Sequence, residues 1–210
     1  LSLRTLSQCL SSNFEEILIN PPQPLESELR STGVAINCEL PDVPAVVLVA
    51  VKPQMMADAL PRLQEMGGGQ TIFVSVAAGT TIGYFETVLG SETPIVRAMP
   101  NTPAAIGKGI TAVIGNEAVS TEGVDEAVQL LQAVGQVVRL ENEAQIDAVT
   151  GVSGSGPAYV FHMIETLAAA GKAQGLPAEM AMQLAKVTVA GAGALAEEAA
   201  ESPSQLRVNV

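Results

Sequence analysis

The sequence has 210 residues, of which 48% are hydrophobic and 15% are charged. An apolar share of this size predicts a packed globular protein and argues against a disordered chain. Lys and Arg number 10 against 22 Asp and Glu, a formal net charge of -12, which argues against nucleic acid or an anionic membrane as a partner. We expect a cytoplasmic protein, because the sequence shows no signal peptide and no convincing membrane span.

Short apolar runs alternate with helical stretches through the first 150 residues. We expect strands at residues 16–20, 34–37, 45–51, 71–76 and 94–99, and helices at 1–10, 24–31, 55–65, 82–89 and 122–133. The run at 45–51 (AVVLVAV) is apolar at every position, which predicts a central strand of a parallel sheet, buried on both faces. The alternation predicts a doubly wound α/β domain over residues 1–150.

Residues 151–210 contain no expected strand. Two long helices are expected at 157–174 and 178–200, joined at Gly175-Leu176-Pro177. Both are apolar around most of their circumference, so they must be buried, and a tail of this length cannot bury itself. We favour an all-helical domain that packs against a partner chain, with packing on the sheet domain as the alternative.

The glycine loop of a dinucleotide-binding domain is absent from the sequence. Such a domain normally opens with a strand, G-x-G-x-x-G and a helix. We expect this strand and loop to precede Leu1. The glycines of the run GVSGSG at 151–156 are spaced G-x-x-G-x-G, the reverse of the dinucleotide motif, and they follow no expected strand. We therefore do not interpret them as the phosphate loop.

Three successive strands of the predicted sheet run into unusual segments. The run at 45–51 continues into Lys52-Pro53, that at 71–76 into Ala77-Ala78-Gly79, and that at 94–99 into Pro100-Asn101-Thr102-Pro103. Ligands of open α/β sheets bind outside the carboxyl ends of the strands, which predicts one shared site. Small residues would let a flat ring approach, a lysine would attract a phosphate, and amide or hydroxyl groups would bind a carboxamide or ribose.

Two asparagines follow the first two predicted strands. Asn20 is neutral where an acidic residue would repel a 2′-phosphate, so NADP is permitted. Asn37 either faces the adenosine or is an ordinary turn residue.

No catalytic pair and no Cys/His metal cluster is evident, and we expect no metal. His162, the single histidine, is interpreted as a packed or interface residue. Ser153 and Ser155 either cap the helix that follows or face a ligand, and we favour capping. Lack of a base suits hydride transfer, in which the coenzyme carries the chemistry.

Four strings together resemble pyrroline-5-carboxylate reductase, a 6-phosphogluconate-dehydrogenase-like reductase: AVKP at 50–53, SVAAG at 75–79, RAMPNTP at 97–103 and GVSGSGPAYVF at 151–161. The resemblance implies a Rossmann-like dinucleotide-binding domain at 1–150 and a helical dimerisation domain at 151–210. It implies reduction of the cyclic imine 1-pyrroline-5-carboxylate to L-proline with NADPH or NADH, by a homodimer or an assembly of dimers.

The resemblance also implies site residues. Those that would line the nicotinamide and ribose are Ala50, Val51, Lys52, Pro53, Val76, Ala77, Ala78, Met99, Pro100, Asn101 and Thr102. Asn37 would lie nearer the adenosine, and Asn209 would reach the coenzyme from the helical domain. The family's substrate loop and proton donor are expected after Val210, which leaves Ser153, Ser155 and Val210 as substrate-facing candidates. The alternatives are a β-hydroxyacid or prephenate dehydrogenase and a non-catalytic dinucleotide-binding sensor.

Overall fold

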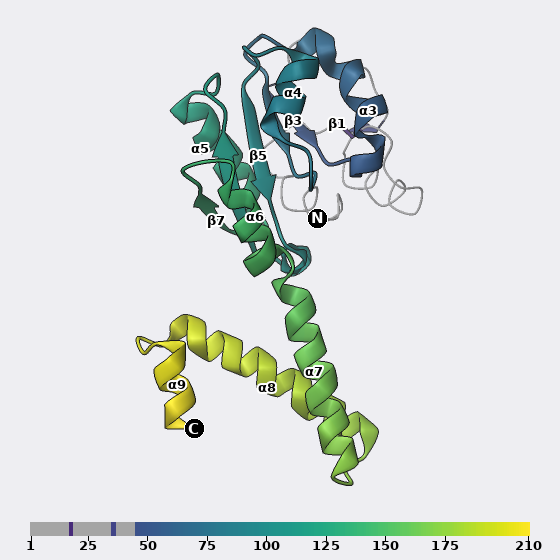
Figure 1. Cartoon of the computed structure of the whole chain (residues 1–210), viewed down its shortest axis with the longest axis vertical. Helices are drawn as coiled ribbons and strands as arrows, with labels where there is room; N and C mark the ends of the chain where they lie inside the picture. Colours follow the sequence, from purple (N-terminus) through teal and green to yellow (C-terminus); the bar gives the residue numbers. More distant parts are fainter. Residues whose placement is uncertain (1–16, 19–34, 37–44) are drawn as a thin grey trace. The chain divides into compact units, whose positions relative to one another are not determined.

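The computed structural model describes residues 17–18, 35–36 and 45–210 (Figure 1). It consists of two compact units, Leu1–Gly154 and Ser155–Val210, and each is described by itself. No helix within the described ranges combines the length and the apolar character that crossing a membrane requires.

The first unit contains a five-stranded sheet in the order β3-β4-β5-β6-β7. Its strands are β3 (Val46–Val49), β4 (Ile72–Ser75), β5 (Ile95–Met99), β6 (Gly109–Gly115) and β7 (Gly135–Arg139). β3, β4 and β5 are parallel, β6 is antiparallel to β5, and β7 is parallel to β6. A separate parallel pair joins β1 (Ile17–Leu18) to β2 (Ala35–Ile36).

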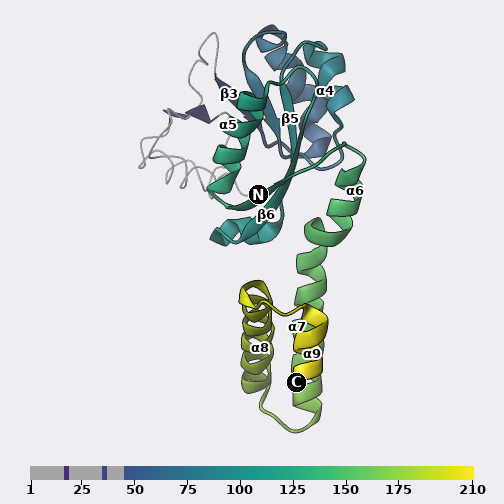
Figure 2. The same ribbon diagram turned by 90° about the vertical axis from the view of Figure 1, so that its left-hand side faces the viewer.

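Helices cover both faces of the five-stranded sheet. Successive side chains of a strand point to opposite faces, so Phe73 and Ile95 pack with Phe85 of α4 (Ile82–Leu89), among other apolar residues. Val74 and Val96 point the other way and pack with Leu131 of α5 (Thr121–Gln132). Figures 1 and 2 show β5 between these two helices. The doubly wound α/β architecture is therefore confirmed.

Side-chain N-caps mark the starts of α4 and α5. The Thr81 hydroxyl accepts from the backbone N–H of Tyr84, and the Ser120 hydroxyl accepts from that of Gly123. Each is an N-cap that binds one of the unpaired amides of a first helical turn. α4 ends at Leu89 and is followed by the C-cap residue Gly90, whose φ of 96° favours glycine. The predicted helix at 82–89 has the observed bounds, and that at 122–133 is shifted by one residue.

The helix predicted at 55–65 is wrong in detail. The structure has a 3₁₀ turn η1 (Pro53–Met55), a short α-helix α3 (Met56–Ala59) and a 3₁₀ segment η2 (Leu60–Met66). Pro61 explains the break, because it has no N–H to donate to the carbonyl four residues earlier.

The sequence prediction missed β6 and β7. The link from β5 to β6 contains only the 3₁₀ segment η3 (Thr102–Ile106), and a parallel crossover needs a dozen residues or more. β6 is therefore antiparallel to β5, which makes the sheet mixed. β7 has the sequence GQVVR, in which only Val137 and Val138 are apolar, so its apolar signal is weak.

The central position predicted for the run at 45–51 is also wrong within the described sheet. β3 is its outer strand, and only Val49 of β3 is buried. β4 and β5 are instead buried at every position. The helices predicted at 1–10 and 24–31 lie outside the described residues, as do the strand ends at Asn20 and Asn37.

The second unit is helical, as predicted. It contains α7 (Gly156–Ala173), α8 (Ala178–Glu198) and α9 (Pro203–Asn209), and α7 and α8 form a hairpin (Figure 2). A short helix α6 (Gln145–Val149) and a π-helical turn η4 (Thr150–Gly154) precede them in the first unit.

Candidate functional site

The carboxyl ends of β3, β4 and β5 lie side by side at one edge of the sheet. Val49 is in register with Ser75, and Ser75 is in register with Arg97. The N–H of Val76 donates to the carbonyl oxygen of Val49 at 3.1 Å, which ties the first two strand ends directly. The structure therefore brings together the three predicted segments, 50–53, 76–78 and 99–102.

This edge offers a cation and a loop of small residues. Lys52 is exposed, and its carbonyl accepts from the N–H of Met55 at 2.8 Å, which starts the turn η1. Ala77 is buried, whereas Ala78 and Gly79 are exposed. Gly79 has a φ of 77°, and a Cβ added there would meet no atom within 4 Å. An exposed cation beside an open loop suits a ligand that carries phosphate and a flat ring.

Asn101 is partly committed to the fold. Its Oδ1 accepts from the N–H of Ile110 at 3.0 Å, so this oxygen holds the start of β6. Its amide N–H groups are then the part that could donate to a ligand. Thr102 next to it is exposed, and Pro100 is half-buried.

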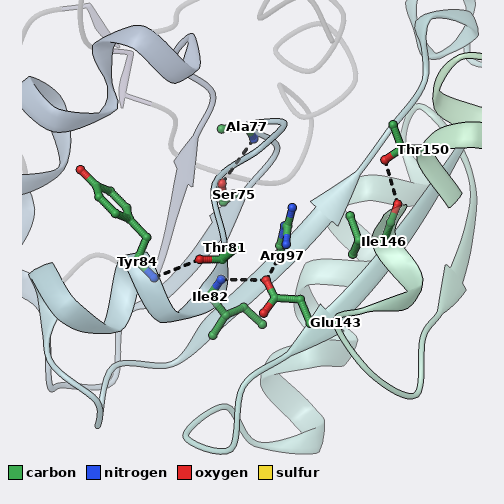
Figure 3. Close-up of polar contacts among 9 residues, drawn as sticks. All are labelled: Ser75, Ala77, Thr81, Ile82, Tyr84, Arg97, Glu143, Ile146 and Thr150. Carbon is green, nitrogen blue, oxygen red and sulfur yellow. Dashed lines mark hydrogen bonds and ion pairs between the residues drawn. The ribbon is translucent and has the colours of Figure 1, made fainter. Parts of the chain in front are cut away.

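Hydrogen bonds anchor loop 77–81 between β4 and α4 at both ends (Figure 3). The N–H of Ala77 donates to Ser75 Oγ at 3.3 Å. At the other end, the N–H of Ile82 donates to Glu143 Oε1 at 2.8 Å. The same oxygen lies 2.6 Å from Arg97 Nη1. The loop is thus held by side chains while its middle stays exposed.

Sequence reasoning did not single out Arg97 and Glu143. Arg97 stands in a strand, IVRAM, that is otherwise apolar and is buried at every position. The signal in the sequence was a cation within an apolar run, because a buried charge needs a partner and so indicates an ion pair. Nothing local could have identified that partner, which lies 46 residues away.

The capping interpretation of Ser153 and Ser155 is wrong. Ser155 occupies the N-cap position of α7 without a side-chain hydrogen bond. Its φ of -87° and ψ of -18° are helical, and N-cap side chains normally reach the first amides from an extended backbone. Ser153 instead donates from Oγ to the carbonyl oxygen of Val149 at 3.2 Å, which links the π-helical turn to the end of α6.

The remaining candidates lie in the second unit or outside the described residues. Asn209 Oδ1 accepts from Gln205 Nε2 at 2.8 Å at the end of α9, next to Val210. The His162 side chain is 76% exposed, so it is not packed within the hairpin. Asn37 lies outside the described residues. Within the described ranges, no group of three or more His, Cys, Asp and Glu side chains could hold a metal ion.

Comparison with known proteins decides the family. A family model described as "Pyrroline-5-carboxylate reductase dimerisation" matches residues 143–210. A pyrroline-5-carboxylate reductase of Pseudomonas aeruginosa is 41% identical over 186 residues, which are 89% of this chain and 68% of the relative. The chain belongs to the pyrroline-5-carboxylate reductase family. The resemblance seen in the sequence is confirmed.

Solved structures agree with this membership. A pyrroline-5-carboxylate reductase from Coxiella burnetii has a TM-score of 0.89 and 32% identity over 97% of this chain and 79% of its own. A pyrroline carboxylate reductase from Plasmodium falciparum with NADP bound has a TM-score of 0.82 and 25% identity over 98% of this chain and 79% of its own. The prephenate dehydrogenase of Aquifex aeolicus, at 13% identity and a TM-score of 0.55 over 78% of this chain and 64% of its own, shows a shared fold alone.

Proposed function

We propose that this protein reduces the C=N bond of 1-pyrroline-5-carboxylate to form L-proline, using NADPH or NADH. The observation that carries the proposal is the edge where β3, β4 and β5 end together, in a chain of this family. In the reaction the imine carbon gains a hydride and the ring nitrogen keeps the proton that completes the secondary amine. When bound, the reduced nicotinamide supplies that hydride.

The residues at this edge fit such a coenzyme. Lys52 is exposed and can attract its phosphate groups, while Ala78 and Gly79 leave the loop surface open to a flat ring. Thr102 and the amide N–H groups of Asn101 can bind a ribose hydroxyl or the carboxamide. The relative from Plasmodium falciparum, solved with NADP bound, supports NADPH as the first coenzyme to test.

The proposed role of the protein is orientation, since a protonated imine accepts hydride without a general base. Holding two reactants in line can supply several kcal/mol of barrier reduction. Ser155 is the better substrate-facing candidate of the two serines, because Ser153 already donates to Val149. Val210 and Asn209 stay predictions, as substrate-facing and coenzyme-binding residues respectively.

The proposal includes a homodimer built on α7 and α8. Within the second unit only Ala168, Ala181 and Ala185 are buried, so the hairpin packs through small side chains. Large apolar residues are exposed instead, among them Tyr159, Phe161, Met163, Leu167, Met180, Leu184, Val187 and Leu195. An exposed apolar surface of this extent favours a partner chain. An assembly of dimers and a cytoplasmic location stay predictions.

The test is an assay of coenzyme oxidation by the purified protein carrying this sequence. Reduced-nicotinamide absorbance is followed with pyrroline-5-carboxylate, and proline is quantified at the end. Proline should form in a one-to-one ratio with oxidised coenzyme. When prephenate and NAD are supplied instead, no NADH should form. Coenzyme binding without turnover of the imine would refute the proposal in favour of a non-catalytic sensor.

A further inference from the structure

Arg97 and Glu143 lie next to the end of the candidate coenzyme loop, where Glu143 contacts the N–H of Ile82. Ser75 and Arg97 are in register on neighbouring strands, two residues beyond Phe73 and Ile95. Side chains two apart share a face of the sheet, so Ser75 and Arg97 point to the face that α4 covers. They therefore lie at the carboxyl end of the apolar layer, next to the start of α4 (Figure 3).

The cation of Arg97 has almost no access to water. Its side chain is 9% exposed, whereas that of Glu143 is 31% exposed. A charge in this position is costly unless it is paired, and the 2.6 Å contact with Glu143 Oε1 supplies the pair. A well-packed apolar pair could often replace such an ion pair without loss of stability, so stability alone does not account for it.

The second contact of Glu143 points to a role at the site. Glu143 Oε1 also accepts from the N–H of Ile82, which is the first residue of α4. The first amides of a helix lack partners within it, and a carboxylate there is favoured by the helix dipole. Thr81 satisfies another amide of the same turn, that of Tyr84, at 3.3 Å. Together the two side chains fix where loop 77–81 ends and α4 begins.

We propose that Glu143 is a positioning residue for the coenzyme: paired with Arg97, it holds the start of α4 and so keeps loop 77–81 in the shape that receives the nicotinamide. Without this contact the loop is ordered only on binding, and that ordering lowers affinity. The inference rests on the proposed coenzyme site. Glu143 and loop 77–81 both lie in the first unit.

The experiment measures direct binding as well as turnover. NADPH binding is followed by the fluorescence of its own nicotinamide. Glu143→Ala should raise both the Kd and the KM for NADPH about tenfold, the change expected when one charge-assisted hydrogen bond is lost. The KM for the imine and kcat at saturating NADPH should change less than about twofold on the same reasoning.

Three further variants separate positioning from general stability. Glu143→Gln keeps an oxygen for the Ile82 amide, so its Kd should stay within about threefold of wild type. Thr81→Ala removes the other contact at the start of α4 and should weaken NADPH binding in the same direction as Glu143→Ala. Ser120→Ala removes the equivalent cap of α5, so it should lower the melting temperature and leave the Kd for NADPH unchanged.

The outcomes distinguish this inference from the proposed function. An unchanged Kd for NADPH in Glu143→Ala, with a lower melting temperature, would overturn the positioning role. Equal weakening of NADPH binding by Ser120→Ala would overturn it as well. A wild-type protein that binds NADPH, loses affinity in Glu143→Ala and does not reduce the imine would support the inference and refute the proposed function.

Discussion

Replacing Asn116 should destabilise the sheet domain without affecting the site. Its Oδ1 accepts from the N–H groups of Ile95 at 3.0 Å and Val119 at 3.2 Å. Its Nδ2 donates to the carbonyl oxygen of Thr93 at 2.9 Å and to Glu86 Oε1 at 3.0 Å. Four hydrogen bonds are the full capacity of one amide side chain. Asn116 therefore links α4, the start of β5 and the end of β6.

The magnitude follows from what Asn116→Ala leaves unpaired. Ile95 and Thr93 are both 0% exposed, so a backbone N–H and a carbonyl would lose their partners in the interior. Each buried orphan costs about 1–3 kcal/mol, and the two bonds nearer the surface add less. We expect a loss of about 3 kcal/mol in the free energy of unfolding. A chain of this size then melts about 6–12 °C lower.

The assay is a thermal melt followed by circular dichroism, beside two further variants. Gln129→Ala changes an exposed amide on α5 and should alter the free energy of unfolding by less than about 0.5 kcal/mol. Asn116→Asp keeps both acceptor bonds but turns an oxygen toward Thr93 and Glu86, so at neutral pH it should be at least as unstable as Asn116→Ala. A wild-type melting temperature for Asn116→Asp would show that the four bonds are not arranged as described.

The KM for NADPH supplies the functional control for Asn116. The residue lies at the amino end of β5, whereas the candidate coenzyme site lies at the carboxyl ends of the parallel strands. Folded Asn116→Ala protein should therefore keep the wild-type KM. A raised KM would contradict the separation of the two ends.

Three other perturbations have defined outcomes. Lys52→Ala should raise the KM for NADPH a few-fold, and the increase should be smaller at high salt because exposed charges are screened. The control is Arg62→Ala, which removes an exposed cation of η2 and should leave the KM for NADPH unchanged. Phe161→Arg should dissociate the proposed dimer, which sedimentation velocity would show as a halved mass. The control is Val138→Arg, which changes an exposed apolar residue of β7 and should leave the sedimenting mass at that of the dimer. Gly135→Ala should prevent folding, seen as loss of soluble protein, because its φ is 145° and a Cβ would overlap the backbone of Gly109.

Local patterns were sufficient for the parts of the fold that depend on near neighbours. The bounds of α4 and α5 follow from Thr81 and Ser120 and from helical periodicity, all within a few residues. The common edge of the three strand ends also followed, because parallel strands with helical crossovers direct their carboxyl ends the same way. Pro61 is also a local signal, and it accounts for the break in the helix predicted at 55–65.

Sequence alone determined the class of fold, the helical second unit and the family, because these depend on periodicity, turn residues and four strings of residues in order. Tertiary structure decided which side chains the edge of the sheet leaves available. The Oδ1 of Asn101 accepts a hydrogen bond from the N–H of Ile110. Glu143 accepts one from the first amide of α4, 61 residues away in the sequence, and also pairs with Arg97. Such pairings depend on which strands become neighbours, and a side chain carries no local signal of the distant partner that folding brings to it.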